Sequence, residues 1–135
     1  MNALMKNESG GFMKKNFFLA LAVIAFVISP IAWSADLLDG AAIKVLFAGK
    51  SISGVNSFGN PYRVEYLKDG NMDGVAGFNN EYVDTGRWWI DGDKFCRQYS
   101  TWFEGVAGCY GISVEGDSVR FHGDDGNVLS ESILE

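Results

Sequence analysis

Glycine turns that separate short strands constrain the fold of this chain more than any other feature of its sequence. An acidic residue precedes glycine at Asp69-Gly70, Asp73-Gly74, Asp91-Gly92, Glu115-Gly116 and Asp125-Gly126. Glycine supplies the positive φ that tight hairpin turns require, and Asp-Gly is a strong hairpin signal. The segments between these pairs are short and rich in aromatic and β-branched residues, which is typical of strands. The pattern predicts a mainly β fold in which hairpins join successive strands.

The strand candidates are 50–55, 61–68, 73–79, 82–90, 94–100, 107–114, 118–123 and 127–133. In the second candidate, Tyr62, Val64 and Tyr66 alternate with polar residues, as in a strand with one buried face. Short antiparallel strands that follow one another along the chain form a meander. We therefore predict an antiparallel meander of about 7–8 short strands, which is either a small closed barrel or an open curled sheet.

One short N-terminal helix is predicted before the first strand. Asp39 is a favourable N-cap, and Gly49 stands where a helix commonly ends. Between them, Ile43, Leu46 and Phe47 have the i, i+3, i+4 spacing of one apolar helical face. We expect this segment to form a helix that packs on the sheet. The alternative is a further strand, because Ile-Lys-Val in the same segment also alternates.

The N-terminal segment is typical of an export signal. Two lysines precede an uninterrupted apolar run from Phe17 to Ile28, and small residues follow it. The run is too short to span a membrane comfortably, since a spanning helix needs roughly 20 apolar residues. We predict a signal peptide over 1–34, with Met13 as the favoured start, and a single β-rich domain over 35–135. The alternative is an uncleaved N-terminal anchor.

Charge and composition exclude several classes of function. The chain has 17 acidic and 11 basic residues and a net charge of −6, and removal of 1–34 leaves −8. Binding to nucleic acid requires a basic face, so we expect no nucleic-acid partner. One His and two Cys are too few for a multi-ligand zinc or haem site, and no cofactor is expected. After signal cleavage no apolar run could span a membrane, so we expect a periplasmic or secreted protein.

The two cysteines are predicted to form a disulfide, which is the usual state of a cysteine pair in an exported chain. If the hairpin is centred on residues 102–103, Cys96 lies directly opposite Cys109. The same register places Phe95 opposite Tyr110 on the other face of the hairpin. The bridge would stabilise the fold by about 3 kcal/mol in the chain-entropy model.

The stretch from Asp84 to Trp102 is the most distinctive part of the sequence, with three Trp, two Arg and one Tyr. Aromatic faces stack on apolar or sugar-like ligands, and an arginine offers a charged group to them. The candidate ligand-binding residues are Arg87, Trp88, Arg97, Tyr99, Trp102 and Tyr110. An arginine at position 97 faces the same side as Phe95, so it must pair with an acid or line a cavity. The alternative is that these aromatics are core residues with arginine packed over an indole.

A partial calcium motif lies at Asp69, Asn71 and Asp73, followed by glycine. The twelfth position of such a loop is Asn80, where a bidentate glutamate is required. We therefore predict β-turn structure here, with a weak calcium site as the alternative and no other metal site.

No catalytic constellation is evident, so we assign no catalytic residue. The single histidine, His122, is expected to be exposed and has no triad-like signature around it. Asp84, Asp91 and Asp93 could supply the paired carboxylates of a glycoside hydrolase, although nothing singles out one pair.

Several short motifs are shared with one known group of proteins. They are Gly49-Lys-Ser-Ile-Ser-Gly54, Asp69-Gly70, Asp84-Thr-Gly-Arg-Trp88, Cys96-Arg-Gln-Tyr99 and Cys109. The chain thereby resembles small exported proteins of Gram-negative bacteria that are classed as a domain of unknown function. Their pattern runs GKTxxG, DG, DTGxW, CxxW and C, with Ser51 here in place of Thr and Tyr99 in place of Trp. The resemblance implies export, a β-rich fold and the cysteine pair, and it implies no activity.

The sequence thus favours a non-enzymatic envelope protein that binds a small ligand or an envelope component. A protein-interaction or inhibitor module of the periplasm is the alternative. A small carboxylate-dependent glycan hydrolase is a lesser alternative.

Overall fold

The computed structural model describes residues 36–135. The signal peptide predicted over 1–34 lies outside these residues. The elements in chain order are α2 (Gly40–Phe47), β1 (Lys50–Val55), β2 (Pro61–Tyr66), β3 (Asn71–Ala76), β4 (Tyr82–Asp91), β5 (Lys94–Tyr99), the 3-10 helix η1 (Trp102–Gly105), β6 (Gly108–Glu115), β7 (Ser118–His122) and β8 (Val128–Leu134). The mainly β fold and the short helix are therefore confirmed.

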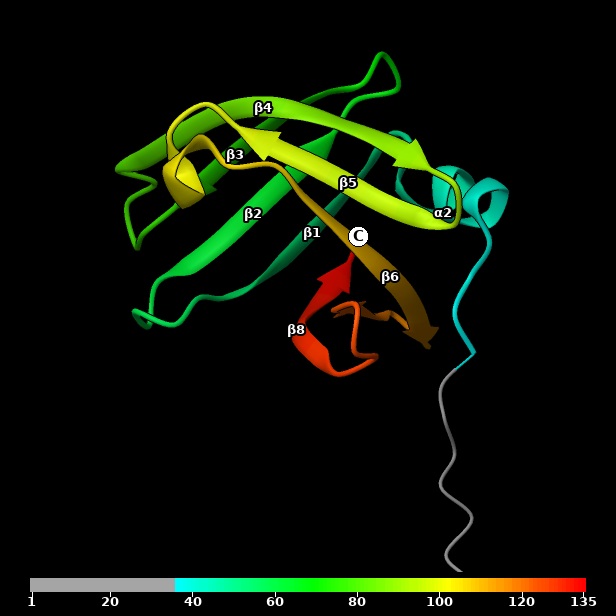
Figure 1. Ribbon diagram of the computed structural model, residues 1–135. Helices are drawn as coiled ribbons and strands as arrows, with labels where there is room; N and C mark the ends of the chain where they lie inside the picture. Colours follow the sequence, from blue (N-terminus) through cyan, green and yellow to red (C-terminus); the bar gives the residue numbers. More distant parts are fainter. Residues whose placement is uncertain (1–35) are drawn as a thin grey trace, which may run out of the picture. The chain divides into compact units, whose positions relative to one another are not determined.

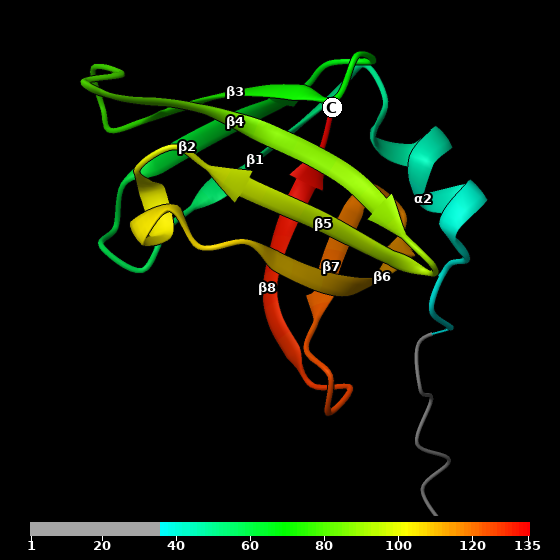
Figure 2. The same cartoon turned by 45° about the horizontal axis from the view of Figure 1, so that its top comes forward.

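The eight strands form a closed antiparallel barrel in which each strand pairs with the next along the chain (Figures 1 and 2). The barrel closes where β8 pairs with β1, with Ile52 opposite Leu134 and Ser53 opposite Ile133. Two backbone hydrogen bonds extend this seam, because Ser51 and Glu135 exchange N–H and carbonyl groups at 3.1 and 2.8 Å. Of the two predicted architectures, the structure thus has the closed barrel.

Helix α2 covers one end of the barrel (Figure 1). It begins where an Asp39 carboxylate oxygen accepts a hydrogen bond from the backbone N–H of Ala42 at 2.8 Å. Ile43 and Phe47 are fully buried, and the Phe47 ring stacks on Phe95 of β5 with centroids 4.3 Å apart. The predicted helix and its apolar face are confirmed, and the alternative of a further strand is wrong.

The barrel core includes the buried face of this helix. Its fully buried side chains include Ile52, Val64, Tyr66, Met72, Phe95, Ile112 and Val119. The opposite end is where β1, β3 and β5 finish, and we call it the open end. In Figure 1, η1 lies at this end and α2 lies at the other.

The cysteines form the predicted disulfide across β5 and β6. Cys96 pairs with Cys109 in the strand register, and their sulfur atoms are 2.09 Å apart. Phe95 lies opposite Tyr110, as the hairpin register predicts. This pair is compatible with a location outside the cytoplasm. No helix in the part of the chain described by the structure is long and apolar enough to cross a membrane.

One predicted turn is wrong. Asp73 and Gly74 lie inside β3, which begins at Asn71, and Gly74 does not have a positive φ. A Cβ atom at Gly74 would come within 2.5 Å of the Trp102 ring. This glycine is therefore required by the close approach of an indole rather than by a turn. By contrast, Gly70, Gly92, Gly116 and Gly126 all have the positive φ expected of turn glycines.

Candidate functional site

Four of the predicted ligand-binding residues, Arg97, Tyr99, Trp102 and Tyr110, lie around the barrel interior. Trp88 instead packs on Tyr66 and Phe95 in the core, and its indole N–H donates to the carbonyl of Leu67 at 2.8 Å. Trp88 and Tyr99 are buried, and Arg97, Trp102 and Tyr110 are partly buried. The Tyr99 and Trp102 rings lie 5.2 Å apart, so the end of β5 and η1 meet at this site. The structure places the sixth residue elsewhere, as described below.

Arg97 is surrounded by aromatic rings. Its guanidinium carbon lies 5.0 Å from the Phe121 ring centroid, 5.2 Å from Tyr110, 5.6 Å from Phe103 and 5.7 Å from Tyr99. Ion pairs among residues 36–135 join Arg63 to Glu135, Lys94 to Asp124, and Arg120 to Glu115 and Glu131, and none includes Arg97. The charge inside the barrel is thus opposed by ring faces and not by a carboxylate.

The hydroxyl group of Tyr66 lies close to this charge. Tyr66 is fully buried, and its hydroxyl has no hydrogen-bond partner among the described residues. Burial raises the pKa of Tyr66 strongly and Tyr99 adds to this rise, whereas the charge of Arg97 and the approach of its N–H groups to the phenol oxygen oppose it. The same burial acts to lower the pKa of Arg97, but Tyr66, Tyr99 and Tyr110 outweigh it and raise that pKa. Tyr66 is therefore a neutral phenol beside a permanent cation.

Glycines on the inner face make room for the aromatic side chains of the open half. A Cβ atom at Gly54 would lie 2.8 Å from the Tyr62 hydroxyl, and one at Gly108 would lie 2.2 Å from that of Tyr110. Tyr62 is fixed across the barrel by a hydrogen bond of 2.5 Å between its hydroxyl and that of Ser132. Tyr62 and Tyr66 could not be singled out from the sequence, because both follow the alternation of an ordinary core strand.

Asp84 holds η1 against the open end. One of its carboxylate oxygens accepts hydrogen bonds from the backbone N–H groups of Thr101 and Trp102 at 2.9 and 2.7 Å. The other accepts from the N–H of Thr85 at 2.9 Å. Burial acts to raise the pKa of Asp84, but these N–H donors outweigh it and the pKa is lowered. The carboxylate thereby fixes the turn that carries Trp102 over Gly74.

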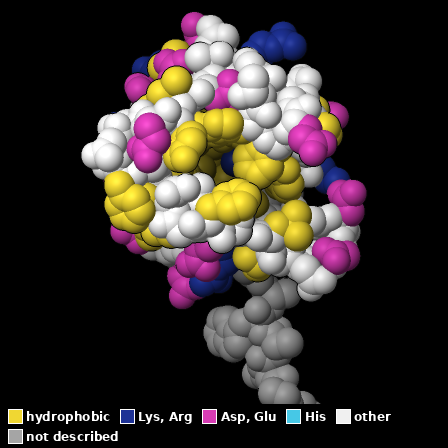
Figure 3. Space-filling view, turned by 90° about the vertical axis from the view of Figure 1, so that its left-hand side faces the viewer, with side chains coloured by type: hydrophobic (Ala, Val, Ile, Leu, Met, Phe, Trp, Pro, Cys, Tyr) yellow, Lys and Arg dark blue, Asp and Glu magenta, His cyan; other side chains and the backbone are white. Residues whose placement is uncertain are grey.

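Exposed hydrophobic side chains are concentrated at the open end. Phe58 is 88% exposed in the β1–β2 loop, and Phe78 is 77% exposed in the β3–β4 loop. We call these side chains the apolar rim, which consists of Val55, Phe58, Phe78, Tyr82, Val83, Phe103 and Val106. Figure 3 looks onto this end and shows hydrophobic side chains around a central hollow.

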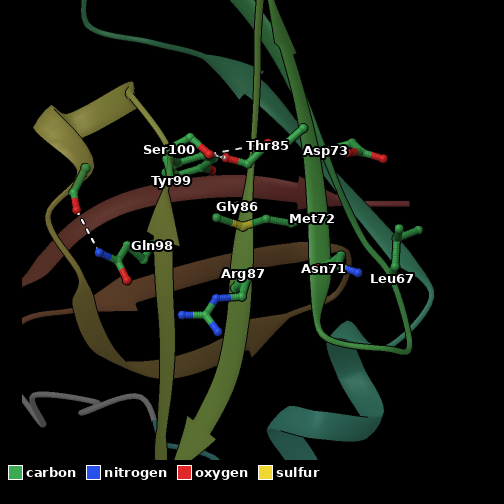
Figure 4. Close-up of a pocket in the computed structure, with 11 residues that line it drawn as sticks. Leu67, Asn71, Met72, Asp73, Thr85, Gly86, Arg87, Gln98, Tyr99 and Ser100 are labelled. Carbon is green, nitrogen blue, oxygen red and sulfur yellow. Dashed lines mark hydrogen bonds between the residues drawn. The ribbon is translucent and has the colours of Figure 1, made fainter.

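Arg87 lies on the outer face of the barrel. It lines a shallow groove of about 620 Å³ that crosses β3, β4 and β5 (Figure 4). The polar groups of the groove are largely bonded to one another. The Gln98 side-chain amide donates to the backbone carbonyl of Gly105 at 2.9 Å. The Ser100 hydroxyl donates to the backbone carbonyl of Thr85 at 2.9 Å. The groove and the interior site are thus separate places, although Tyr99 lines both.

The calcium alternative finds no support in the geometry. The Asp69 carboxylate accepts hydrogen bonds from the backbone and side-chain nitrogens of Asn71 at 2.9 and 3.0 Å, as in an Asx turn. Asp73 lies on β3 opposite Glu65 and Thr85. Within residues 36–135, no group of three or more His, Cys, Asp or Glu side chains could hold a metal ion.

His122 is buried, so the expectation of an exposed histidine is wrong. The loop between β7 and β8 folds back over it, and its Nδ1 lies 3.0 Å from the carbonyl oxygen of Gly126. A carbonyl can only accept, so Nδ1 carries the hydrogen, and Nε2 accepts from the Ser113 hydroxyl at 2.7 Å in the neutral ring. Both partners of this pair are buried. The arrangement ties the loop to β6.

Of the three carboxylates considered for hydrolysis, Asp84 lies at the open end, whereas Asp91 and Asp93 lie together at the other end, where they line one cavity with Asp39. Both carboxylate oxygens of Asp84, at the open end, accept hydrogen bonds from backbone N–H groups. Asp93 is at the other end, where it accepts a hydrogen bond from the N–H of Gly40 at 2.9 Å, the first residue of α2. Both have structural roles as acceptors, which gives the hydrolase alternative no paired acids from these two residues.

No protein-family model, curated protein or solved structure matches the chain. The functional conclusion therefore depends on the geometry of the open end.

Proposed function

We propose that the protein is an exported, non-enzymatic binding module that takes a small, largely apolar ligand into the open end of the barrel. The observation that carries this proposal is the apolar rim around a hollow at the one barrel end that α2 does not cover. The interior of an eight-stranded barrel is either filled by side chains or just wide enough to hold one small ligand. Ligand sites are typically concave and apolar with a few polar groups, as this one is.

The concentration of the exposed apolar groups supports a binding role. Single exposed hydrophobic residues are ordinary, but contiguous patches mark sites of interaction. Here the strand ends and the loops of the open end supply the patch, and Phe103 reaches from the rim to the interior charge of Arg97. A ligand seated there would contact the rim and the barrel interior together.

Export is part of the proposal. The Cys96–Cys109 disulfide supports it, because disulfides persist in oxidising compartments and are rare in the cytosol. The predicted signal peptide supports it independently. A periplasmic or secreted location would give the barrel access to envelope components.

A protein partner is the second candidate. It is favoured by Phe58 and Phe78, which are almost free of contacts at the tips of two loops. Apolar loop tips can insert into a groove of another protein, as inhibitor modules do. In that case the rim would be covered from outside and the hollow would remain without a ligand.

The test uses N-phenyl-1-naphthylamine, an uncharged apolar dye whose fluorescence rises in an apolar site. We expect saturable binding of about one dye per protein. Phe103→Asp should weaken it about tenfold or more, because the loss of one apolar ring contact and the added charge disfavour the apolar dye. Val45→Asp is the matched control, since Val45 is exposed on α2 at the other end.

Two results would overturn the proposal. One is fluorescence that rises linearly without saturation, which would leave the rim to a protein partner. The other is an equal loss of affinity in Phe103→Asp and Val45→Asp, which would show that the dye does not bind at the open end.

A further inference from the structure

We propose that Arg97 and the Tyr66 hydroxyl form a receptor for the carboxylate of an amphiphilic ligand. The ligand would place its carboxylate inside the barrel and its apolar tail against the apolar rim. This inference rests on the proposed function and gives it a chemical class of ligand, a monocarboxylate with an apolar chain.

The first support is the hydrogen-bonding state of Arg97. A guanidinium has five N–H donors in a planar fork that matches a carboxylate. Arg63 and Arg120 donate to the side chains of Ser51 and Glu131, whereas the acceptor beside Arg97 is the phenol oxygen of Tyr66, and no carboxylate among residues 36–135 pairs with Arg97. The rings around Arg97 attract its charge through their faces, but they do not satisfy a fork of donors as a carboxylate does. A ligand carboxylate would supply the missing acceptor.

The second support is Tyr66. A buried polar group without a partner is rare in folded proteins and calls for an explanation. The Tyr66 hydroxyl has no well-formed hydrogen bond among the described residues, although Arg97 is close enough for both its charge and its N–H groups to act on the phenol oxygen. Since burial keeps this phenol protonated, its O–H is available to donate to an anion. One carboxylate could thus accept from both residues.

The third support is access. Arg97 is only partly buried, and Phe103, one of the rings beside it, belongs to the apolar rim. Along β5 the order is Phe95 beside the helix, then Arg97, then Tyr99 toward the open end. A group that enters from the open end therefore meets the charge before it reaches the packed core. This order gives the ligand its direction, with the head group inward.

A purely structural role for Arg97 is the competing explanation. Cation–π contacts with four rings could by themselves hold the side chain in place. On that explanation the barrel would not distinguish a charged head group from a neutral one. The two explanations therefore differ in a measurable preference.

The experiment compares dodecanoate with dodecanol, which share a chain and differ in the head group. Each displaces N-phenyl-1-naphthylamine from the protein at pH 8, with dodecanoate below its micelle-forming concentration and dodecanol below its solubility limit. We expect dodecanoate to bind about tenfold or more tightly than dodecanol, as for a charge-assisted hydrogen bond. Arg97→Met should abolish this preference and keep the dodecanol affinity within about threefold. Tyr66→Phe should reduce the preference and leave dodecanol unchanged.

Two control variants test whether the preference for the carboxylate depends on Arg97. Arg87→Met removes an arginine from the outer groove and should leave the preference intact. Arg97→Lys retains the charge without the fork and should keep part of the preference, even if Arg97→Met does not fold.

The failures of the two proposals can be told apart. If wild-type protein binds dodecanol and dodecanoate equally, the carboxylate receptor is wrong while the apolar site stands. If Arg87→Met removes the preference as Arg97→Met does, the receptor is not inside the barrel. If neither compound displaces the dye and the dye itself does not saturate, the proposed function is wrong.

Discussion

Asp84 is the residue on which the geometry of the open end depends most directly. Its carboxylate accepts three backbone hydrogen bonds, two of them from the start of η1. These bonds favour the charged form and lower the pKa despite the opposing effect of burial. A carboxyl group whose pKa is lower in the folded state stabilises the fold above its unfolded-state pKa. This stability is lost as the pH falls through the folded-state pKa.

We predict that Asp84→Asn lowers the free energy of unfolding at pH 7 by about 1–3 kcal/mol, because an amide cannot replace both acceptor oxygens. The difference from wild type should shrink as the pH falls below the ordinary range of carboxyl groups, since wild-type Asp84 then becomes neutral too. Urea denaturation at a series of pH values measures both effects. Asp73→Asn, at an exposed position on β3, is the control and should change little. A loss for Asp84→Asn that does not vary with pH would contradict the assignment.

Helix α2 and the disulfide hairpin are the two elements that depend most on single contacts. Phe47 carries the packing of α2, because its ring contacts Phe95, Tyr66 and Phe121 inside the barrel. The β5–β6 pair has a register of three residue pairs, with the disulfide in the middle one. Each element therefore gives a prediction.

Phe47→Ala should lower the free energy of unfolding by about 3–5 kcal/mol, the usual cost of truncating a buried phenylalanine. Val45→Ala on the same helix should change it by less than about 0.5 kcal/mol, because Val45 is 77% exposed. Chemical denaturation of both variants measures the difference. Similar effects for the two substitutions would show that α2 does not pack into the barrel end through Phe47.

Reduction of the Cys96–Cys109 disulfide should lower the free energy of unfolding by about 3 kcal/mol, as expected for a closed loop of this size. Denaturation with and without reductant measures it, and mass spectrometry confirms the two-hydrogen difference. The double variant Cys96→Ala with Cys109→Ala should be insensitive to reductant. A reductant effect that persists in the double variant would mean that it does not act through this bridge.

Sequence patterns predicted the helix start and the hairpin turns correctly where these depend on a few neighbouring residues. The N-cap at Asp39 and the turn at Gly92 are properties of a few adjacent residues, and both are present. The hairpin register followed from the cysteine pair, since only one pairing brings the two sulfurs together. Gly74 misled the prediction because its role depends on Trp102, which is distant in sequence. His122 misled it for a different reason, since the loop that follows it turns back, and the carbonyl of Gly126, four residues away, covers a side chain that looks exposed in the strand pattern.

At the scale of the whole molecule, the barrel has one end covered by a helix and one end ringed by apolar side chains (Figures 1 and 3). The closure itself could not be predicted, because the seam between β1 and β8 joins the two ends of the strand series. The candidate site was predicted in part, as the aromatic-rich stretch marked Arg97 and its neighbours. Tyr66 could not be recognised, since a missing hydrogen-bond partner is visible only in three dimensions.

The most direct test of ligand binding inside the open end is a proton–nitrogen correlation spectrum of the protein titrated with dodecanoate. We predict that the largest shift changes occur at the Arg97 side-chain Nε–H and at the backbone amides of Tyr99 and Trp102. The amides of α2 at the opposite end should change little. Changes confined to α2 or to the outer groove around Arg87, with the Arg97 side chain unaffected, would contradict binding inside the barrel.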